Sequence, residues 1–225
     1  MKDGSPAGTQ IPPRRVSRAD RSAQTRDALL DAARRVFVRA GYHGTSVDAV
    51  AAEAGYTIGA VYSRFDGKAG LFLALLERRI DERIEQIAAV ADRAAPVDDS
   101  VAISRQWGKV LRTDMGWTLL VIEFRVHAAR HPDLAARFAA LHDRLVQALT
   151  DALSRASGPD GPARERVERF ARVALSMGPG AALARAAEGE AFGDELMEAA
   201  TEAVAARLLG PGGGHDGRHD RPGPR

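Results

Sequence analysis

Several short side chains between Thr57 and Arg64 have the chemistry of a surface that reads DNA. The Thr57 hydroxyl can bond a phosphate oxygen or a base edge, while Gly59 and Ala60 permit close approach and contact with a thymine methyl group. Arg64 can read a guanine. These contacts require the residues to lie on one exposed face of a helix, so the neighbouring sequence must supply that helix.

The preceding segment predicts a short helix that ends in a tight turn. Ser46, or Thr45 just before it, is a hydroxyl N-cap, and backbone N–H groups at this helix end also suit a phosphate oxygen. The helix spans residues 47–54, with an apolar stripe at spacings of three and four. Gly55 follows, and glycine adopts left-handed backbone angles without penalty.

A second short helix begins after Thr57, which is its predicted N-cap. Its apolar positions at helical spacing are Ile58, Val61, Tyr62 and Phe65. Two short helices joined by a glycine-containing turn form a helix-turn-helix, whose second helix can enter the DNA major groove. The same residues also fit an ordinary helical hairpin within an all-helical domain.

The composition of the 225-residue chain is that of an all-α protein without disulfides. It contains no cysteine, its aromatic residues make up only 5%, and alternating β-branched runs are absent. No apolar run approaches the roughly 18 residues of a membrane span, and the N-terminus lacks the layout of a signal peptide. We therefore expect a cytoplasmic all-α protein with no membrane partner.

Charge is distributed unevenly along the chain. The net charge of +2 excludes a polycation that binds nucleic acid through bulk charge, but residues 1–26 carry six basic and two acidic side chains. Residues 1–20 are rich in proline, glycine and serine, which predicts a disordered segment. This segment is either a basic arm that attracts DNA or a solvated tail without a binding role. Residues 210–225 are of low complexity and predict a disordered tail.

Two longer helices are predicted to flank the helix-turn-helix. The first covers about residues 25–40 and ends at Gly41, and it should complete a three-helix head over residues 21–67. Its apolar face comprises Leu29, Leu30, Ala33, Phe37 and Val38. The second covers about residues 68–91 and should link the head mechanically to the rest of the chain. Its periodic positions are Leu71, Phe72, Leu75, Leu76, Arg79, Ile80, Ile84 and Ile87.

The stretch 25–77 closely resembles the TetR family of one-component transcriptional regulators. The resemblance rests on Phe37, Gly41, Thr45, Ser46, Ala51, Gly55, Gly59, Val61, Tyr62, Phe65 and Lys68. It implies that Tyr62 and Lys68 reach phosphates. The chain departs from the family at Ile58, where a polar or basic residue is common, so specificity is expected to lean on DNA shape and on the arm.

The predicted DNA-binding residues are Thr45, Ser46, Thr57, Ile58, Gly59, Ala60, Tyr62, Ser63, Arg64 and Lys68. A single head is expected to bind DNA weakly, so we expect a homodimer that binds two DNA half-sites related by a two-fold axis. Small and apolar residues in two C-terminal segments, 163–187 and 194–209, predict its interface as a four-helix bundle. The alternative is that these helices pack only within the chain.

The body, residues 68–209, is predicted to be helical, which gives about nine helices in the whole chain. Its segments after the long helix are 99–111, 117–130, 132–153, 163–187 and 194–209. Gly116 is expected to interrupt the chain before the second of these segments, and residues 158–162 form a loop. The run 178–180, Gly-Pro-Gly, should kink or break its helix.

The resemblance also implies a ligand pocket in the body. Small-molecule sites are mostly apolar, with a few polar groups that orient the ligand. The predicted lining residues are Trp107, Trp117, Leu120, Val121, Phe124 and Met177, with Glu123 and His127 as polar anchors. These aromatic and apolar side chains fit plain core equally well.

A metal site is an alternative use of the same helix. Glu123, His127 and His131 follow one another at spacings of four, which metal sites use. Pro132 disfavours helical geometry at His131, and only His142 is a further candidate ligand. We therefore predict no metal and no cofactor.

Together these features predict a ligand-responsive regulator, a repressor that binds a palindromic operator as a homodimer. The resemblance implies that a small-molecule effector bound in the body releases the DNA, with the long helix altering the separation of the two heads. The alternative is a helical metal- or small-molecule-binding protein without sequence-specific DNA binding. The sequence has no nucleophile–base constellation and no phosphate-binding loop, so we do not expect an enzyme.

Overall fold

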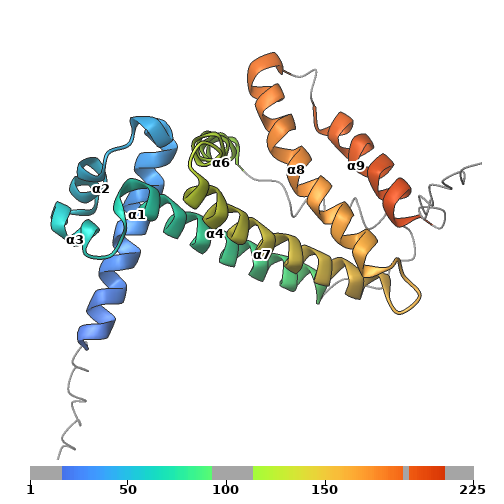
Figure 1. Cartoon of the computed structure of the whole chain (residues 1–225), viewed down its shortest axis with the longest axis horizontal. Coiled ribbons are helices and arrows are strands. Elements are labelled where there is room, and N and C mark those ends of the chain that lie inside the picture. Colours follow the sequence, from blue (N-terminus) through green and yellow to red (C-terminus); the bar gives the residue numbers. More distant parts are fainter. Residues whose placement is uncertain (1–16, 93–113, 190–192, 211–225) are drawn as a thin grey trace, which may run out of the picture.

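The computed structural model describes residues 17–92, 114–189 and 193–210, and these residues form eight α-helices and no strand. The helices are α1 (Arg18–Gly44), α2 (Val47–Ala54), α3 (Ile58–Tyr62), α4 (Gly67–Ala91), α6 (Met115–Ala128), α7 (Pro132–Ser157), α8 (Arg164–Glu188) and α9 (Asp194–Leu209). Figure 1 shows α1–α3 as a head at one end, α4 and α7 side by side in the middle, and α8 and α9 at the opposite end. The predicted all-α class is confirmed.

The first helix begins earlier than predicted, at Arg18 rather than near Thr25. Ser17 and Asp20 form a capping box, in which each side chain accepts a hydrogen bond of 3.0 Å from the other residue's N–H group. The last residues of the predicted disordered arm are therefore helical, and residues 1–16 lie outside the described part. Val38 is exposed instead of buried, because it lies one residue beyond the stripe that ends at Phe37.

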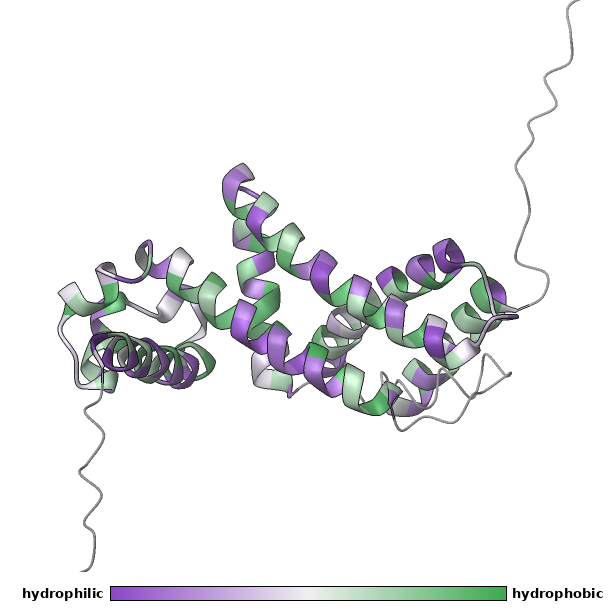
Figure 2. Cartoon of the chain, turned by 90° about the horizontal axis from the view of Figure 1, so that it is seen from below, coloured by the Kyte–Doolittle hydropathy of each residue, from purple (hydrophilic) through white to green (hydrophobic). Residues whose placement is uncertain are grey.

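Two hydrophobic clusters form the core. The first joins α1–α3 to the N-terminal half of α4, to α6 and to Phe138 of α7. The second joins Ile87 of α4 to α7, α8 and α9. Hydrophobic and hydrophilic residues both occur along the long helices, as amphipathic helices require (Figure 2). Because the first cluster crosses the boundary predicted at residue 67, the head shares its core with the body.

The body differs from the predicted one at two glycine-containing positions. Gly116 lies in the first turn of α6, where the Asp114 carboxylate accepts a hydrogen bond of 2.9 Å from the Trp117 N–H, so the glycine does not interrupt the helix. α8 continues through Pro179 without the predicted break. It packs against α6, α7 and α9, and these contacts outweigh the local preference to break.

The remaining predictions concern the bounds of segments in the body and at the C-terminal end. The helix predicted over 99–111 lies outside the described residues, as does the predicted tail from residue 211 onward. Pro132 begins α7 as predicted, and α9 begins at Asp194 as predicted. Within the described ranges, no helix is long and apolar enough to cross a membrane.

Candidate DNA-binding head and ligand cavity

The turn between α2 and α3 has the hydrogen bonds that fix a helix-turn-helix. The predicted N-caps are present, since the hydroxyl of Ser46 and that of Thr57 each accept a backbone N–H at the start of their helices. Gly55 has φ +71°, and the N–H of Tyr56 donates to the carbonyl of Ala51 at 2.9 Å, as in a Schellman motif. The turn predicted at Gly55 is therefore confirmed.

The short helix α3 has one buried side and one exposed side. Val61 and Phe65 are buried, whereas Ile58 is 44% exposed and Tyr62 is 59% exposed. Ile58 and Tyr62 occur at helical spacing with Val61 and Phe65, and they are also predicted DNA-binding residues. Their exposure fits the second role, because α3 has only five residues and packs against α2 and α4. We call the exposed set the α3 surface, and it comprises Thr57, Ile58, Gly59, Tyr62 and Ser63.

Two predicted DNA-binding side chains turn inward instead. Thr45 is buried, and its hydroxyl donates a hydrogen bond of 2.7 Å to the carbonyl of Gly41, so this hydroxyl does not face a phosphate. Arg64 folds back on α3, where Nη1 donates to the carbonyl of Ala60 at 3.1 Å and to the hydroxyl of Ser63 at 2.9 Å. A guanine contact would require Arg64 to leave these partners.

Lys68 also has partners within the protein. Its ammonium donates to the carbonyl of Tyr42 at 3.0 Å and to that of His43 at 3.3 Å, and it lies 4.8 Å from the centre of the Tyr42 ring. A positive charge at the C-terminal end of α1 is favourable for the helix dipole. The phosphate contact implied for Lys68 stays a prediction, and it would have to share the ammonium with these carbonyls.

One face of α6 contacts the head at Tyr42 of α1. The Glu123 carboxylate accepts a hydrogen bond of 2.7 Å from the Tyr42 N–H, just after the kink in α1 at Gly41. The ring centres of Phe124 and His127 lie 5.1 Å and 5.0 Å from that of Tyr42. The structure therefore directs Glu123 and His127, the predicted polar anchors of the ligand, toward the head.

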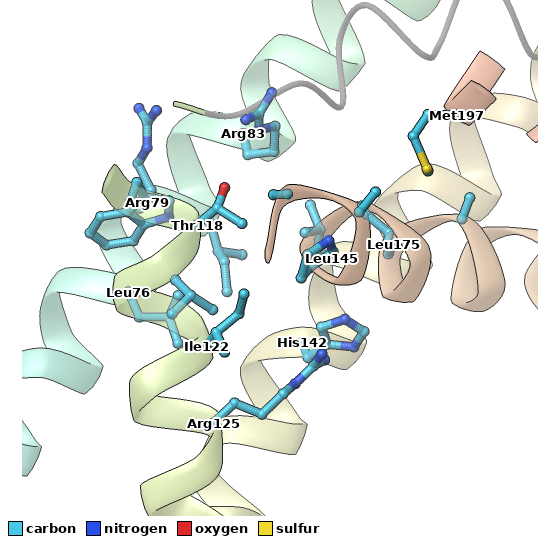
Figure 3. Close-up of a pocket in the computed structure, with 18 of the residues that line it drawn as sticks. Leu76, Arg79, Arg83, Thr118, Ile122, Arg125, His142, Leu145, Leu175 and Met197 are labelled. Carbon is cyan, nitrogen blue, oxygen red and sulfur yellow. The ribbon is translucent and has the colours of Figure 1, made fainter. Parts of the chain in front are cut away.

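The other face of α6 lines a cavity of about 310 Å³ between α4, α6, α7, α8 and α9 (Figure 3). Of the predicted pocket residues, Trp117 and Val121 line this cavity. Leu120 and Phe124 are buried in the first hydrophobic cluster, on the side of α6 that faces the head. Met177 is partly buried on α8 but is not part of the lining, and Trp107 lies outside the described residues.

The cavity also has charged residues that sequence reasoning missed. Four arginines line it, namely Arg79 and Arg83 of α4, Arg125 of α6 and Arg185 of α8, together with Glu198 and Glu202 of α9. Burial lowers the pKa of the Arg83 guanidinium, and the nearby charge of Arg79 lowers it further. The high arginine content of the whole chain hides these positions. The one available signal was the occurrence of Arg79 on the apolar stripe of α4.

The metal alternative is not favoured by the side-chain positions. No group of three or more potential metal ligands is found within the described ranges. The rings of His127 and His131 lie only 4.3 Å apart, but Glu123 is engaged by the Tyr42 N–H. His131 instead approaches the carbonyl of His127 at 2.8 Å through Nδ1.

The chain has clear similarity to known proteins. Residues 29–75 match the family described as bacterial regulatory proteins, tetR family. The transcriptional repressor AcnR of Corynebacterium efficiens is 30% identical over 134 residues, which cover 52% of this chain and 71% of AcnR. The chain belongs to the TetR family. It is a DNA-binding transcriptional regulator rather than an enzyme.

Two further TetR-family comparisons extend over most of the chain. The transcriptional activator FasR of Mycolicibacterium smegmatis is 28% identical over 174 residues, which cover 76% of each protein. The crystal structure of FadR from Bacillus subtilis in complex with stearoyl-CoA matches with a TM-score of 0.58 at 16% identity, over 84% of this chain and 99% of FadR. The fold of the head and body is therefore that of the TetR family.

Stability of this TetR-family chain is expected to fall in mild acid. Burial lowers the pKa of His127, and the charges of His131, His43, Lys68 and Arg130 lower it further. Burial also lowers the pKa of His142. The charges of Arg125 and Arg172 lower it further, whereas the charge of Asp143 raises it. A histidine whose pKa is lower in the folded state stabilises the fold at pH values above 6.5, the ordinary pKa of the unfolded chain. This stability is lost as the pH falls through the folded-state pKa, because the unfolded chain binds the proton more tightly.

The measurement is thermal unfolding between about pH 7.5 and about pH 5.5, where histidine titrates. The melting temperature of the unmodified chain should decrease over this range. His127→Gln should decrease it less steeply, because glutamine cannot be protonated there. Identical slopes for the two proteins would contradict the assignment.

Proposed function

We propose that this TetR-family regulator is a repressor that binds a palindromic operator as a homodimer and releases it when a small molecule occupies the cavity. The observation that carries the proposal is the double contact of α6, which lines the cavity with one face and bonds the head with the other. A protein that binds a metal or small molecule without reading DNA is less well supported, because the head keeps an exposed α3 surface.

The α3 surface suits direct contact with a major groove. Thr57, Ile58 and Gly59 are exposed at the start of α3, where apolar and small side chains can approach a thymine methyl group. Tyr62 follows at its end and can donate a hydroxyl hydrogen bond to a phosphate, whereas the Ser63 hydroxyl already donates to the carbonyl of Ala60 at 3.0 Å. With few side chains that read base edges, specificity should depend partly on DNA shape.

Dimerisation is supported by the outer sides of α8 and α9. Small or apolar residues are exposed along α8 at alternating spacings of three and four, as Val173, Ser176, Gly180, Leu183 and Ala187. The same spacing recurs on α9 as Leu196, Ala199, Ala203 and Ala206. A second copy would cover both stripes in a four-helix bundle, and the two heads would then lie at opposite ends of the dimer.

Effector response would follow from a shift between two dimer states. A ligand in the cavity contacts α4, α6 and α8 together, so it can favour one relative position of these helices. Because Glu123 connects α6 to the head, a movement of α6 changes the head position. The ligand releases DNA only if it binds the released state more tightly.

Selection of bound sequences from a random DNA pool by the full chain tests this proposal. We expect a palindrome, and Tyr62→Ala should weaken binding to it by about tenfold or more, because a hydrogen bond to a charged phosphate is lost in each head. Tyr62→Phe retains the ring and separates the two contributions. Because Tyr62 is exposed, neither variant should change the melting temperature.

The absence of any enriched motif, with a folded dimer present, would contradict sequence-specific binding. Val126→Ala is the control for DNA affinity, since Val126 is exposed on α6 outside the head. Transcription from a promoter that contains the selected site then distinguishes repression from activation. AcnR is named as a repressor and FasR as an activator, so this measurement is needed to decide whether this chain represses or activates transcription.

A further inference from the structure

More basic than acidic side chains line the cavity. Four arginines line it, whereas its only carboxylates among the described residues are Glu198 and Glu202, both on α9. His142 also lines it, and burial lowers the pKa of this imidazole, so it adds no charge near neutral pH. Partly desolvated side chains are screened less than surface charges, so this excess of positive charge acts on any bound molecule.

The arginines belong to the lining faces of their helices. On α4 the lining residues Leu76, Arg79, Ile80 and Arg83 follow one another at the spacing of a single helical face. On α6, Arg125 follows Trp117, Val121 and Ile122 on one face in the same way. These guanidinium groups therefore reach the cavity as a consequence of helix geometry. Figure 3 shows Arg79 and Arg83 at one end of the cavity and Arg125, beside His142, at the other.

Arg125 is the arginine whose charge is best placed for a ligand. Among the described residues it forms no salt bridge, and its guanidinium lies 5.4 Å from the centre of the Phe138 ring. Arg79 differs, because its guanidinium pairs with the Glu82 carboxylate at 2.9 Å. The cation–π contact with Phe138 restrains the guanidinium group of Arg125, and its N–H donors can still pair with an anion.

Most of the remaining lining is apolar, and the cavity is limited in volume. Trp117, Val121, Leu145 and Leu175 come from three helices and surround the space between the two charged ends. The volume of about 310 Å³ is near the lower end of the range of about 300–1,000 Å³ for small-molecule sites. One molecule with a short apolar part and a compact polar head would fill it.

We propose that the cavity binds an amphipathic organic anion, whose carboxylate or phosphate head pairs with Arg125 and whose apolar part lies against Trp117 and Leu145. The inference rests on the proposed function, in which this anion is the effector. A planar guanidinium forms two parallel hydrogen bonds with either head group. A cation of the same size and shape would be repelled by the positive charge of Arg125.

Calorimetric titration of the full chain with four ten-carbon compounds tests the class of ligand. The compounds are decanoate, decyl phosphate, decanol and decyltrimethylammonium, all below the concentrations at which they form micelles. At least one anion should bind about tenfold or more tightly than the alcohol and the cation. The better anion identifies the head group as a carboxylate or a phosphate. Equal or tighter binding of the cation or the alcohol would overturn the proposal.

Variants locate the head group. Arg125→Met retains the apolar stem over Phe138 and should weaken anion binding about 10- to 100-fold, while binding of decanol changes little. Arg125→Lys retains the positive charge but lacks the planar guanidinium group, so it should bind the anion more tightly than Arg125→Met and more weakly than the unmodified chain. Arg137→Met is the matched control, since Arg137 is exposed on α7 and does not line the cavity. Equal losses in Arg125→Met and Arg137→Met would overturn the assignment of Arg125.

Gel-shift titrations on the selected operator separate this inference from the proposed function. If the chain binds its operator and neither anion binds the protein, the inference fails and DNA recognition stands. If the anions bind with the predicted dependence on Arg125 but no operator is found, the proposed function fails and the cavity assignment stands.

Discussion

Phe124→Ala should lower the free energy of unfolding by about 3–5 kcal/mol, the usual cost of removing a large aromatic side chain from a core. Phe124 is fully buried, and its ring centre lies 4.4 Å from that of Phe72 and 5.1 Å from that of Tyr42. These three rings come from α6, α4 and α1, so the cavity left by alanine lies where head and body meet. Chemical denaturation monitored by circular dichroism measures the loss.

The control for this variant is Val126→Ala, because Val126 lies two residues later on the same helix and is exposed. It should change stability by less than about 0.5 kcal/mol. Because head and body share the first cluster, unfolding of Phe124→Ala should remain a single transition in which both parts unfold together. A separate early transition for the head would contradict this coupling, because the body would then stay folded without α1–α3.

Gly41→Ala is expected to cost about 3 kcal/mol or more, through backbone strain together with loss of a hydrogen bond to a charged group. Gly41 has φ +72° and ψ +173°, a combination that essentially only glycine adopts. A Cβ atom here would lie 2.8 Å from Oε2 of Glu123, the oxygen that accepts the Tyr42 N–H. The substitution therefore strains α1 and displaces the carboxylate that joins the body to the head.

Gly55→Ala separates these two effects. Gly55 also has positive φ, but its ψ of 26° is in the left-handed region, and a Cβ atom there would meet nothing within 4 Å. Its cost should be about 1 kcal/mol, that of left-handed strain alone. Equal losses for Gly41→Ala and Gly55→Ala would contradict a role for the Glu123 contact.

A double-mutant cycle measures the contact itself. Glu123→Ala removes the carboxylate with which the new Cβ atom would collide. The loss of stability caused by Gly41→Ala should therefore be smaller in the Glu123→Ala background than in the unmodified chain. If α6 transmits the effector signal, Glu123→Ala should also reduce the change in operator affinity that the effector causes. Full release of operator DNA from this variant by the effector would contradict coupling through Glu123.

Local chemistry in the sequence determined the all-α class, the helix-turn-helix and its caps. Hydroxyl residues at helix starts and glycine at positive φ act within a few residues, so Ser46, Thr57 and Gly55 could be assigned without tertiary information. The same holds for Pro132 at the start of α7. The TetR-family resemblance was carried by this same segment, which is why it identified the head better than the body.

Only the tertiary structure decided which face of each helix meets which neighbour. The periodicity of α6 shows an apolar helix but cannot tell the side facing the head from the side facing the cavity, so it could not show that Glu123 and His127 lie toward the head. Arg125 was missed for the same reason, since its burial depends on α7 and α8, which are distant in sequence. Helical spacing places side chains on a common face, but the choice of neighbour is made by packing of the whole chain.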